Sequence, residues 1–238
     1  MQPHKLTYLL PNFLTASSIF VGILSLIEAS QGHFTQAAWL ILLALLFDGM
    51  DGRVARLTGT TSRFGVEFDS LADIVSFGIA PAMLLYFYVG QHFGRFGILI
   101  SALYVIFGAV RLARFNVTTA QNDPNVFIGL PIPTAAVALA TSLLFLEEYQ
   151  LHDWALVLLI AALPVALLMV SNIRYPSFKT VHLDRPIVYK TLIILMLVAS
   201  LLYLFSAEGL AVLVWAYIGY GPIRAVRTMS LRTFYRKS

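Results

Sequence analysis

Four aspartates lie within one short stretch of the chain: Asp48, Asp51, Asp69 and Asp73. A helix turns by about 100° per residue, so Asp48 and Asp51 share one face, as do Asp69 and Asp73. Two such helices side by side would gather four carboxylates. Carboxylate oxygens are hard ligands, and with no histidine nearby they favour Mg²⁺, Mn²⁺ or Ca²⁺ over zinc or copper. Four of them suffice for two divalent cations, the arrangement that enzymes use for phosphoryl-group displacement.

The acids sit between apolar runs that are long enough to cross a bilayer. A charged side chain inside a membrane is costly unless something compensates it. Two carboxylates about 4 Å apart also repel by roughly 4 kcal/mol at an effective dielectric near 20. Cations or protons must therefore accompany the cluster. Ion pairs with Arg53 or Arg56 are the structural alternative, but two arginines do not balance four acids.

The elements that would position these acids are membrane helices. The 238 residues are 59% hydrophobic and 12% charged, which is unlike a soluble domain and does not favour nucleic-acid binding. The absence of cysteine excludes disulfides and thiolate sites. The pattern predicts an all-α integral membrane protein with about eight transmembrane helices in one bundle, forming a single domain over residues 1–238. The expected spans are 8–29, 34–56, 68–90, 96–115, 130–148, 152–173, 187–206 and 209–227.

The basic residues predict the orientation of this bundle. All 16 lysines and arginines except Arg95 fall on one side of the eight-helix arrangement. By the positive-inside rule that side is cytoplasmic, so both termini and the aspartate cluster face the cytoplasm. We expect a multi-pass protein of the inner (cytoplasmic) membrane. Its basic C-terminal tail, residues 228–238, would lie on anionic lipid headgroups.

Residues 48–73 follow the pattern D-x-x-D-G-x-x-A-R-x8-G-x3-D-x3-D. This stretch resembles the signature of the CDP-alcohol phosphotransferase family. The run from Pro11 to Thr15 is similar to the N-terminal Pro-Asn motif of that family. The segments 111–116, 129–133 and 174–179, together with the number of expected helices, resemble the bacterial type II phosphatidylserine synthases. Ser18 departs from this likeness, because asparagine is expected there in many serine synthases.

The resemblance implies a CDP-alcohol phosphotransferase fold and a reaction. The donor would be CDP-diacylglycerol, the acceptor L-serine, and the products phosphatidylserine and CMP. Two divalent cations, Mg²⁺ or Mn²⁺ with Ca²⁺ as a third choice, would be held by Asp48, Asp51, Asp69 and Asp73. Asp73 would also act as the general base that takes the proton of the serine hydroxyl. A homodimer embedded among membrane lipids is implied as well.

Six residues are expected to bind CDP-diacylglycerol: Asn12, Thr15, Gly52, Arg56, Ser62 and Gly65. Arg56 is placed to pair with the diphosphate. Glycine inside a helix costs about 1 kcal/mol relative to alanine, so Gly49 and Gly52 need a reason to be there. Without side chains, they would let a nucleotide approach the backbone.

Three residues are candidates for binding the acceptor: Arg111, Arg114 and Asn116. The carboxylate of serine needs a guanidinium or a helix N-terminus, and the two arginines enter a helix end on the side of the aspartates. They serve equally well as positive-inside anchors.

Two other functions fit parts of the pattern. The same chemistry with choline, inositol phosphate or glycerol phosphate as acceptor is one, although choline is a cation and favours aromatic cages over arginines. The other is a cation transporter with the aspartates along its pathway. A transporter predicts acids spread across the depth of the membrane, whereas these acids cluster at one level.

Overall fold

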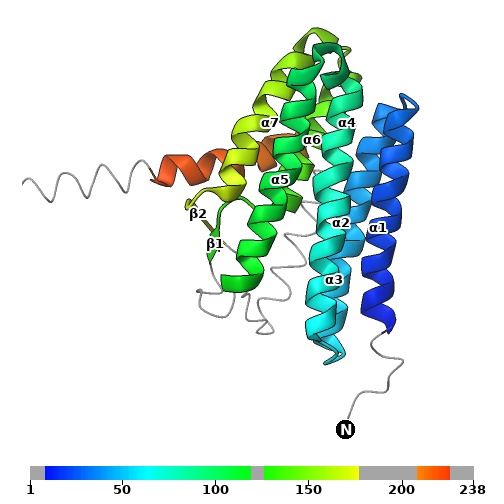
Figure 1. The fold of residues 1–238 in the computed structure, drawn as a ribbon, viewed down its shortest axis with the longest axis vertical. Helices are drawn as coiled ribbons and strands as arrows, with labels where there is room; N and C mark the ends of the chain where they lie inside the picture. Colours follow the sequence, from blue (N-terminus) through cyan, green and yellow to red (C-terminus); the bar gives the residue numbers. More distant parts are fainter. Residues whose placement is uncertain (1–8, 119–125, 177–207, 226–238) are drawn as a thin grey trace, which may run out of the picture.

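The computed structural model describes residues 9–118, 126–176 and 208–225 (Figure 1). The described chain is mostly helical, with one small two-stranded ribbon that the all-α expectation did not include. The elements in order are α1 (Leu9–Ser30), α2 (Phe34–Leu57), α3 (Arg63–Asp73), η2 (Ile74–Ile79), α4 (Ala80–Tyr88), η3 (Gly90–Phe93), α5 (Arg95–Thr118), β1 (Val126–Ile128), α6 (Ile132–Glu148), η4 (His152–Trp154), α7 (Ala155–Val170), β2 (Arg174–Pro176) and a helix over residues 208–225.

Helices α1 and α2 form an antiparallel hairpin whose contact face is built from small residues. Ala37, Ala38 and Ala44 of α2 are fully buried. Small side chains allow close approach of helix backbones, and hydroxyls can then bond across the interface. Ser25 Oγ donates to the Ala37 carbonyl at 2.8 Å, and Ser18 Oγ lies 3.3 Å from the Ala44 carbonyl. These bonds fix the register of α1 along α2.

The helix that carries Asp69 and Asp73 changes its winding directly after Asp73. Helix α3 ends at Asp73, the π-helical segment η2 follows, and α4 continues to Tyr88. The Ala80 N–H donates to the Val75 carbonyl, five residues back rather than four. Ser76 lies on this segment and bonds to the Ser18 hydroxyl and carbonyl of α1 at 3.1 and 2.9 Å. The sequence predicted an uninterrupted helix, and π-helical turns of this kind often lie at functional sites.

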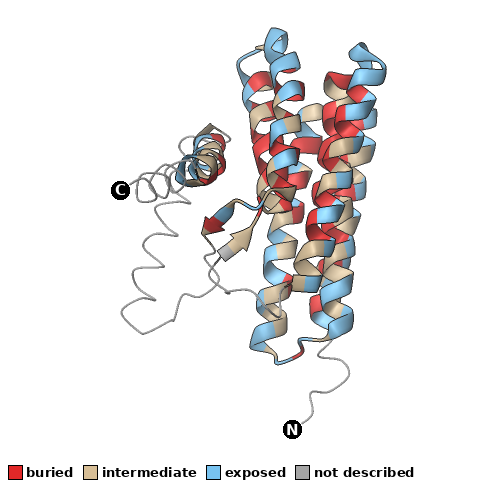
Figure 2. Ribbon diagram, turned by 60° about the vertical axis from the view of Figure 1, so that its left-hand side comes forward, coloured by how far each residue is buried: buried red, intermediate tan, exposed pale blue. Residues whose placement is uncertain are grey.

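The second group of helices is α5, α6 and α7 (Figure 1). The ribbon pairs β1 with β2 in antiparallel register, with Phe127 opposite Tyr175. The helix over residues 208–225 contacts this ribbon, because Tyr175 donates to the Ile218 carbonyl at 3.2 Å and Tyr217 to the Pro176 carbonyl at 3.1 Å. Figure 2 shows that buried residues lie along the helix faces that turn toward one another.

Four helical stretches among the described residues are long and apolar enough to cross a membrane: Leu9–Ser30, Arg63–Tyr88, Arg95–Thr118 and His152–Val170. The expected count of about eight is therefore not confirmed. Helix α6 has only 17 residues, and the second half of α2 carries charged residues from Asp48 to Arg56. The expected span 187–206 and the basic tail 228–238 lie outside the described residues.

Candidate metal and nucleotide site

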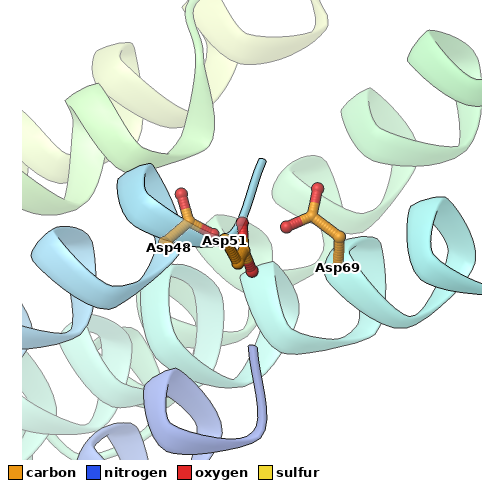
Figure 3. Close-up of side chains that lie close together, drawn as sticks. All are labelled: Asp48, Asp51 and Asp69. Atoms are coloured by element: carbon orange, nitrogen blue, oxygen red, sulfur yellow. The ribbon is translucent and has the colours of Figure 1, made fainter. Parts of the chain in front are cut away.

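Three of the four aspartates converge from two neighbouring helices. Asp48 and Asp51 lie on α2 and Asp69 on α3, and one carboxylate oxygen of each lies within 4.8 Å of those of the other two. In Figure 3 the carboxyl groups of Asp48 and Asp69 reach toward the space in which Asp51 lies between them. Like charges at this separation repel, so a partner of opposite charge is required for the cluster to be ionised.

Asp73 lies beside this group and is only 8% exposed. Its carboxyl interacts with those of Asp48, Asp69 and Asp51 and with the guanidinium of Arg111. The four aspartates therefore form one connected set of acids. Arg111 lies on α5, so its interaction with Asp73 links this set of acids to that helix.

The donor atoms of this cluster fit a hard divalent cation. Asp48 Oδ1 and Asp73 Oδ1 are both buried and have no hydrogen-bond partner among the described residues. A buried carboxylate oxygen without a partner loses its hydration and receives nothing in return, which costs free energy. The donor set contains oxygen atoms alone, the ligands that Mg²⁺, Mn²⁺ and Ca²⁺ prefer.

A pocket of about 310 Å³ opens next to the carboxylates. All six residues predicted to bind CDP-diacylglycerol line it: Asn12, Thr15, Gly52, Arg56, Ser62 and Gly65. Asp51, Asp69 and Asn116 line it as well. Gly49 does not line the pocket, and a Cβ there would meet nothing within 4 Å. Of the two glycines of α2 that were expected to let a nucleotide approach the backbone, only Gly52 borders the pocket.

The floor of the pocket includes the start of α3. Ser62 is the N-cap residue of this helix, and its Oγ accepts the Gly65 N–H at 3.0 Å. A helix N-terminus presents free backbone N–H groups and a positive dipole end, which suits an anionic ligand. A Cβ at Gly65 would lie 3.2 Å from Ser62 Oγ and 3.8 Å from Asn12 Oδ1. The contact with Asn12 of α1 would be an ordinary one, so the glycine chiefly leaves room for the Ser62 cap at the start of α3.

The sequence reasoning missed Thr60, Thr61 and Phe115, which also line the pocket. The two threonines lie in the connection from α2 to α3, where Ser62 and Gly65 were already candidates. Phe115 lies between Arg114 and Asn116 at the end of α5, so its place in that motif was the available signal. Its ring lies 5.2 Å from the Arg111 guanidinium carbon, a cation–π distance.

The three residues predicted to bind the acceptor are placed differently from one another. Arg111 is buried, 6% exposed, and its Nε has no hydrogen-bond partner among the described residues. Its guanidinium interacts electrostatically with the carboxylate of Asp73, one of the clustered acids. Asn116 borders the pocket and joins α5 to α3, since its Nδ2 donates to Ser70 Oγ at 3.0 Å and to Glu67 Oε2 at 3.2 Å.

Arg114 is directed away from the pocket. Its guanidinium donates to four carbonyl oxygens and one amide oxygen at 2.9–3.4 Å: those of Ile128, Met169, Val170, Ser171 and Asn172. Arginine near a helix C-terminus satisfies carbonyls that have no partner within the helix. Arg114 thus joins the end of α7 and strand β1 to α5, and the structure gives it a supporting role.

Replacing Arg114 by glutamine is expected to destabilise the fold by about 2 kcal/mol, because it removes charge-assisted bonds to several carbonyls at once. The measurement is thermal unfolding of the purified protein in detergent. Arg53→Gln is the matched control, since Arg53 is exposed on α2. Equal melting temperatures for the two variants would contradict this role of Arg114.

Comparison with known proteins places the chain in a family. A profile described as CDP-alcohol phosphatidyltransferase matches residues 8–170, more than half of the sequence. A relative from Helicobacter pylori strain J99, named CDP-diacylglycerol–serine O-phosphatidyltransferase, is 50% identical over 93% of both chains. A protein of the same name from Methanocaldococcus jannaschii is 39% identical over 70% of this chain and 73% of its own. An archaetidylserine synthase from Methanothermobacter thermautotrophicus is 41% identical over 70% of this chain and 69% of its own. This chain therefore belongs to the CDP-alcohol phosphatidyltransferase family.

Proposed function

We propose that this protein transfers the phosphatidyl group of CDP-diacylglycerol to the hydroxyl of L-serine, giving phosphatidylserine and CMP. The observation that carries the proposal is the pocket of about 310 Å³ in which residues of the nucleotide motif meet two of the clustered carboxylates. The names of the three relatives share serine as the acceptor and differ in the lipid. A cation pathway is not favoured, because the acids gather at one place instead of following the depth of the bundle.

The donor's charged part lies in the pocket. Arg56 pairs with the diphosphate, and Ser62 and Gly65 lie at the N-terminus of α3, whose positive dipole end favours the same anion. Asn12 and Thr15 form the wall on α1, and Gly52 leaves room for the nucleotide at the surface of α2.

Asp48, Asp51, Asp69 and Asp73 would hold two divalent cations, with Mg²⁺ or Mn²⁺ preferred and Ca²⁺ also suited to the oxygen ligands. Bound there, the cations would supply positive charge to offset that of the diphosphate and of the leaving CMP. The chain's own residues do the remaining work of orientation and proton transfer.

The acceptor lies between Asp73 and Arg111. The Arg111 guanidinium binds the carboxylate of serine, which places the serine hydroxyl toward Asp73. A serine hydroxyl is a weak nucleophile at neutral pH, so Asp73 takes its proton as the oxygen attacks the lipid-linked phosphorus. The bond between that phosphorus and the CMP oxygen breaks, and CMP leaves with the electron pair.

The lipid donor explains the location of the site in a membrane bundle. Its acyl chains need the bilayer and its nucleotide needs water, so the site lies where both are within reach. We infer about eight membrane spans in one domain over residues 1–238, with the termini and the site on the cytoplasmic side of the inner membrane. We also infer a homodimer. The excess of lysine and arginine on one side supports the orientation.

Acceptor specificity tests this proposal. The purified protein is incubated with CDP-diacylglycerol, Mn²⁺ or Mg²⁺ and one acceptor at a time: L-serine, choline, inositol phosphate or glycerol phosphate. CMP release and a new phospholipid are expected when L-serine is the acceptor, and with none of the other three acceptors. A product from choline and none from serine would overturn the choice of acceptor and leave the family chemistry in place. Cation flux in vesicles without any CMP release would overturn the enzyme proposal itself.

Gly52→Ala and Gly49→Ala form a matched pair on α2. A Cβ at Gly52 would project into the pocket beside Arg56, 3.5 Å from one of its guanidinium nitrogens, whereas a Cβ at Gly49 meets nothing within 4 Å. We expect Gly52→Ala to raise the KM for CDP-diacylglycerol by about tenfold, as expected for the loss of about 1.4 kcal/mol of binding. Gly49→Ala should keep the wild-type KM and gain about 1 kcal/mol of stability. Equal KM values for the two variants would contradict the proposal that the nucleotide packs against the backbone at Gly52.

A further inference from the structure

The Thr15 hydroxyl contacts a carboxylate of the acidic cluster. Thr15 Oγ lies 2.5 Å from Asp51 Oδ2 and 3.1 Å from the Pro11 carbonyl. We propose that Thr15 is a positioning residue, whose hydroxyl holds the Asp51 carboxylate in the orientation that binds a cation, and that its hydroxyl is not a contact for the donor lipid. This inference rests on the proposed function, because it assigns the same acids to divalent cations.

The geometry commits the single hydroxyl proton of Thr15 to Asp51. A carboxylate is a stronger acceptor than a carbonyl, and hydroxyl-to-carboxylate bonds are the shorter kind, at about 2.5–2.7 Å. The distance to Asp51 lies in that range and the distance to Pro11 does not. Thr15 and Asp51 are 4% and 5% exposed, so bulk water does not compete strongly for this bond.

Thr15 differs from the other hydroxyls that join α1 to α2. Ser18 and Ser25 reach backbone carbonyls of α2, at Ala44 and Ala37. Such bonds hold one helix against the other, but they do not restrict the side chains of α2. Thr15 bonds to a side chain, so it restricts the rotation of the Asp51 carboxyl group itself. The serines on this face of α1 therefore fix the register of the two helices. The threonine on the same face fixes the orientation of a carboxylate that would bind a cation.

This restriction matters because a carboxylate offers two oxygens and several lone-pair directions. With Oδ2 held by Thr15, and with the Gly52 backbone also bonded to this carboxyl group, the carboxylate has a fixed orientation relative to Asp48 and Asp69. Groups that hydrogen-bond to metal ligands orient them, and their removal typically weakens metal binding by about 10–100-fold. Removing the hydroxyl also leaves a buried carboxylate oxygen without that partner.

The test is a titration of the purified protein with Mn²⁺ alone, followed by electron paramagnetic resonance and without either substrate. Thr15→Val removes the hydroxyl, Thr15→Ser keeps it, and Thr15→Ala is a second variant without it. We expect Mn²⁺ binding to weaken by about tenfold or more in the valine and alanine variants and to stay near wild type in the serine variant.

Ser25→Ala is the control, because it removes a buried bond from α1 to the α2 backbone far along the helix from the acids. It should lower thermal stability and leave the Mn²⁺ titration unchanged. Wild-type Mn²⁺ affinity in both Thr15→Val and Thr15→Ala would overturn the positioning role while the cation site stands. No Mn²⁺ binding by the wild type would overturn the cation site and this inference together. A raised KM for CDP-diacylglycerol with intact Mn²⁺ binding would show that the Thr15 hydroxyl contacts the donor lipid, and would overturn the positioning role.

Discussion

Replacing Asp73 by asparagine is expected to lower the rate of CMP release from CDP-diacylglycerol and L-serine by about 10³-fold. General-base catalysis contributes roughly 10²–10⁴ in rate, and asparagine has no basic oxygen that can take the proton of the serine hydroxyl. Asparagine has nearly the same size as aspartate, so the packing around this buried residue is kept. The measurement is kcat at saturating donor, acceptor and Mn²⁺.

The position of Asp73 makes this effect specific. Asp153→Asn is the matched control, because Asp153 is exposed in η4 and lies outside the acidic cluster. We expect wild-type kcat for that control and wild-type thermal unfolding for both variants. A folded Asp73→Asn protein that keeps more than a tenth of the wild-type kcat would remove Asp73 as the base.

Replacing Arg111 by glutamine is expected to raise the KM for L-serine by about 100-fold. Truncating one partner of a buried, hydrogen-bonded charge pair costs about 2–5 kcal/mol, and 2.7 kcal/mol corresponds to a factor of 100. Ethanolamine, which lacks the carboxylate, should be used no worse by this variant than by the wild type. The ratio of kcat/KM for L-serine to that for ethanolamine therefore measures the role of Arg111 directly.

Arg111→Lys and Arg53→Gln complete that experiment. Lysine keeps the charge and loses the planar fork that matches a carboxylate, so its KM for serine should lie between those of wild type and Arg111→Gln. Arg53 is exposed on α2 and does not border the pocket, so its variant should match the wild type. An unchanged preference for serine over ethanolamine in Arg111→Gln would assign the serine carboxylate to another group.

The spacing of the aspartates was sufficient to place them on shared helix faces, and the structure brings three of their carboxylates within 4.8 Å of one another. This works because helical periodicity is a local property that sequence spacing fixes directly. Seven of the expected spans overlap observed helices, because long apolar runs mark helices clearly, although the span expected to begin at residue 68 begins at Arg63. The number of helices that cross the membrane does not follow from the apolar runs as directly, because a short helix or one with charged residues is not recognisable as a span.

Arg111 and Arg114 illustrate what the sequence could not separate. Both stand near the end of the same helix, and composition alone makes them equivalent. In the structure Arg111 is buried beside Asp73, whereas Arg114 is fully engaged by carbonyls of α7 and β1. The difference depends on which distant segments pack against each face of α5. Only tertiary contacts carry that information.

The π-helical segment behind Asp73 has a consequence for insertions and deletions. A π turn accommodates one residue more than an α turn, so deleting one residue between Ile74 and Ile79 would restore regular winding. A π turn and an α turn both complete about one full rotation, so this deletion would leave α3 and α4 facing almost the same way, and Asp69 and Asp73 would stay turned toward the acids of α2. A deletion between Asp69 and Asp73, in the regular α-helix, would instead turn one of these aspartates away from the other by about 100°. We therefore expect the chain to keep activity after losing one residue of the π-helical segment and to lose activity after losing one residue of α3.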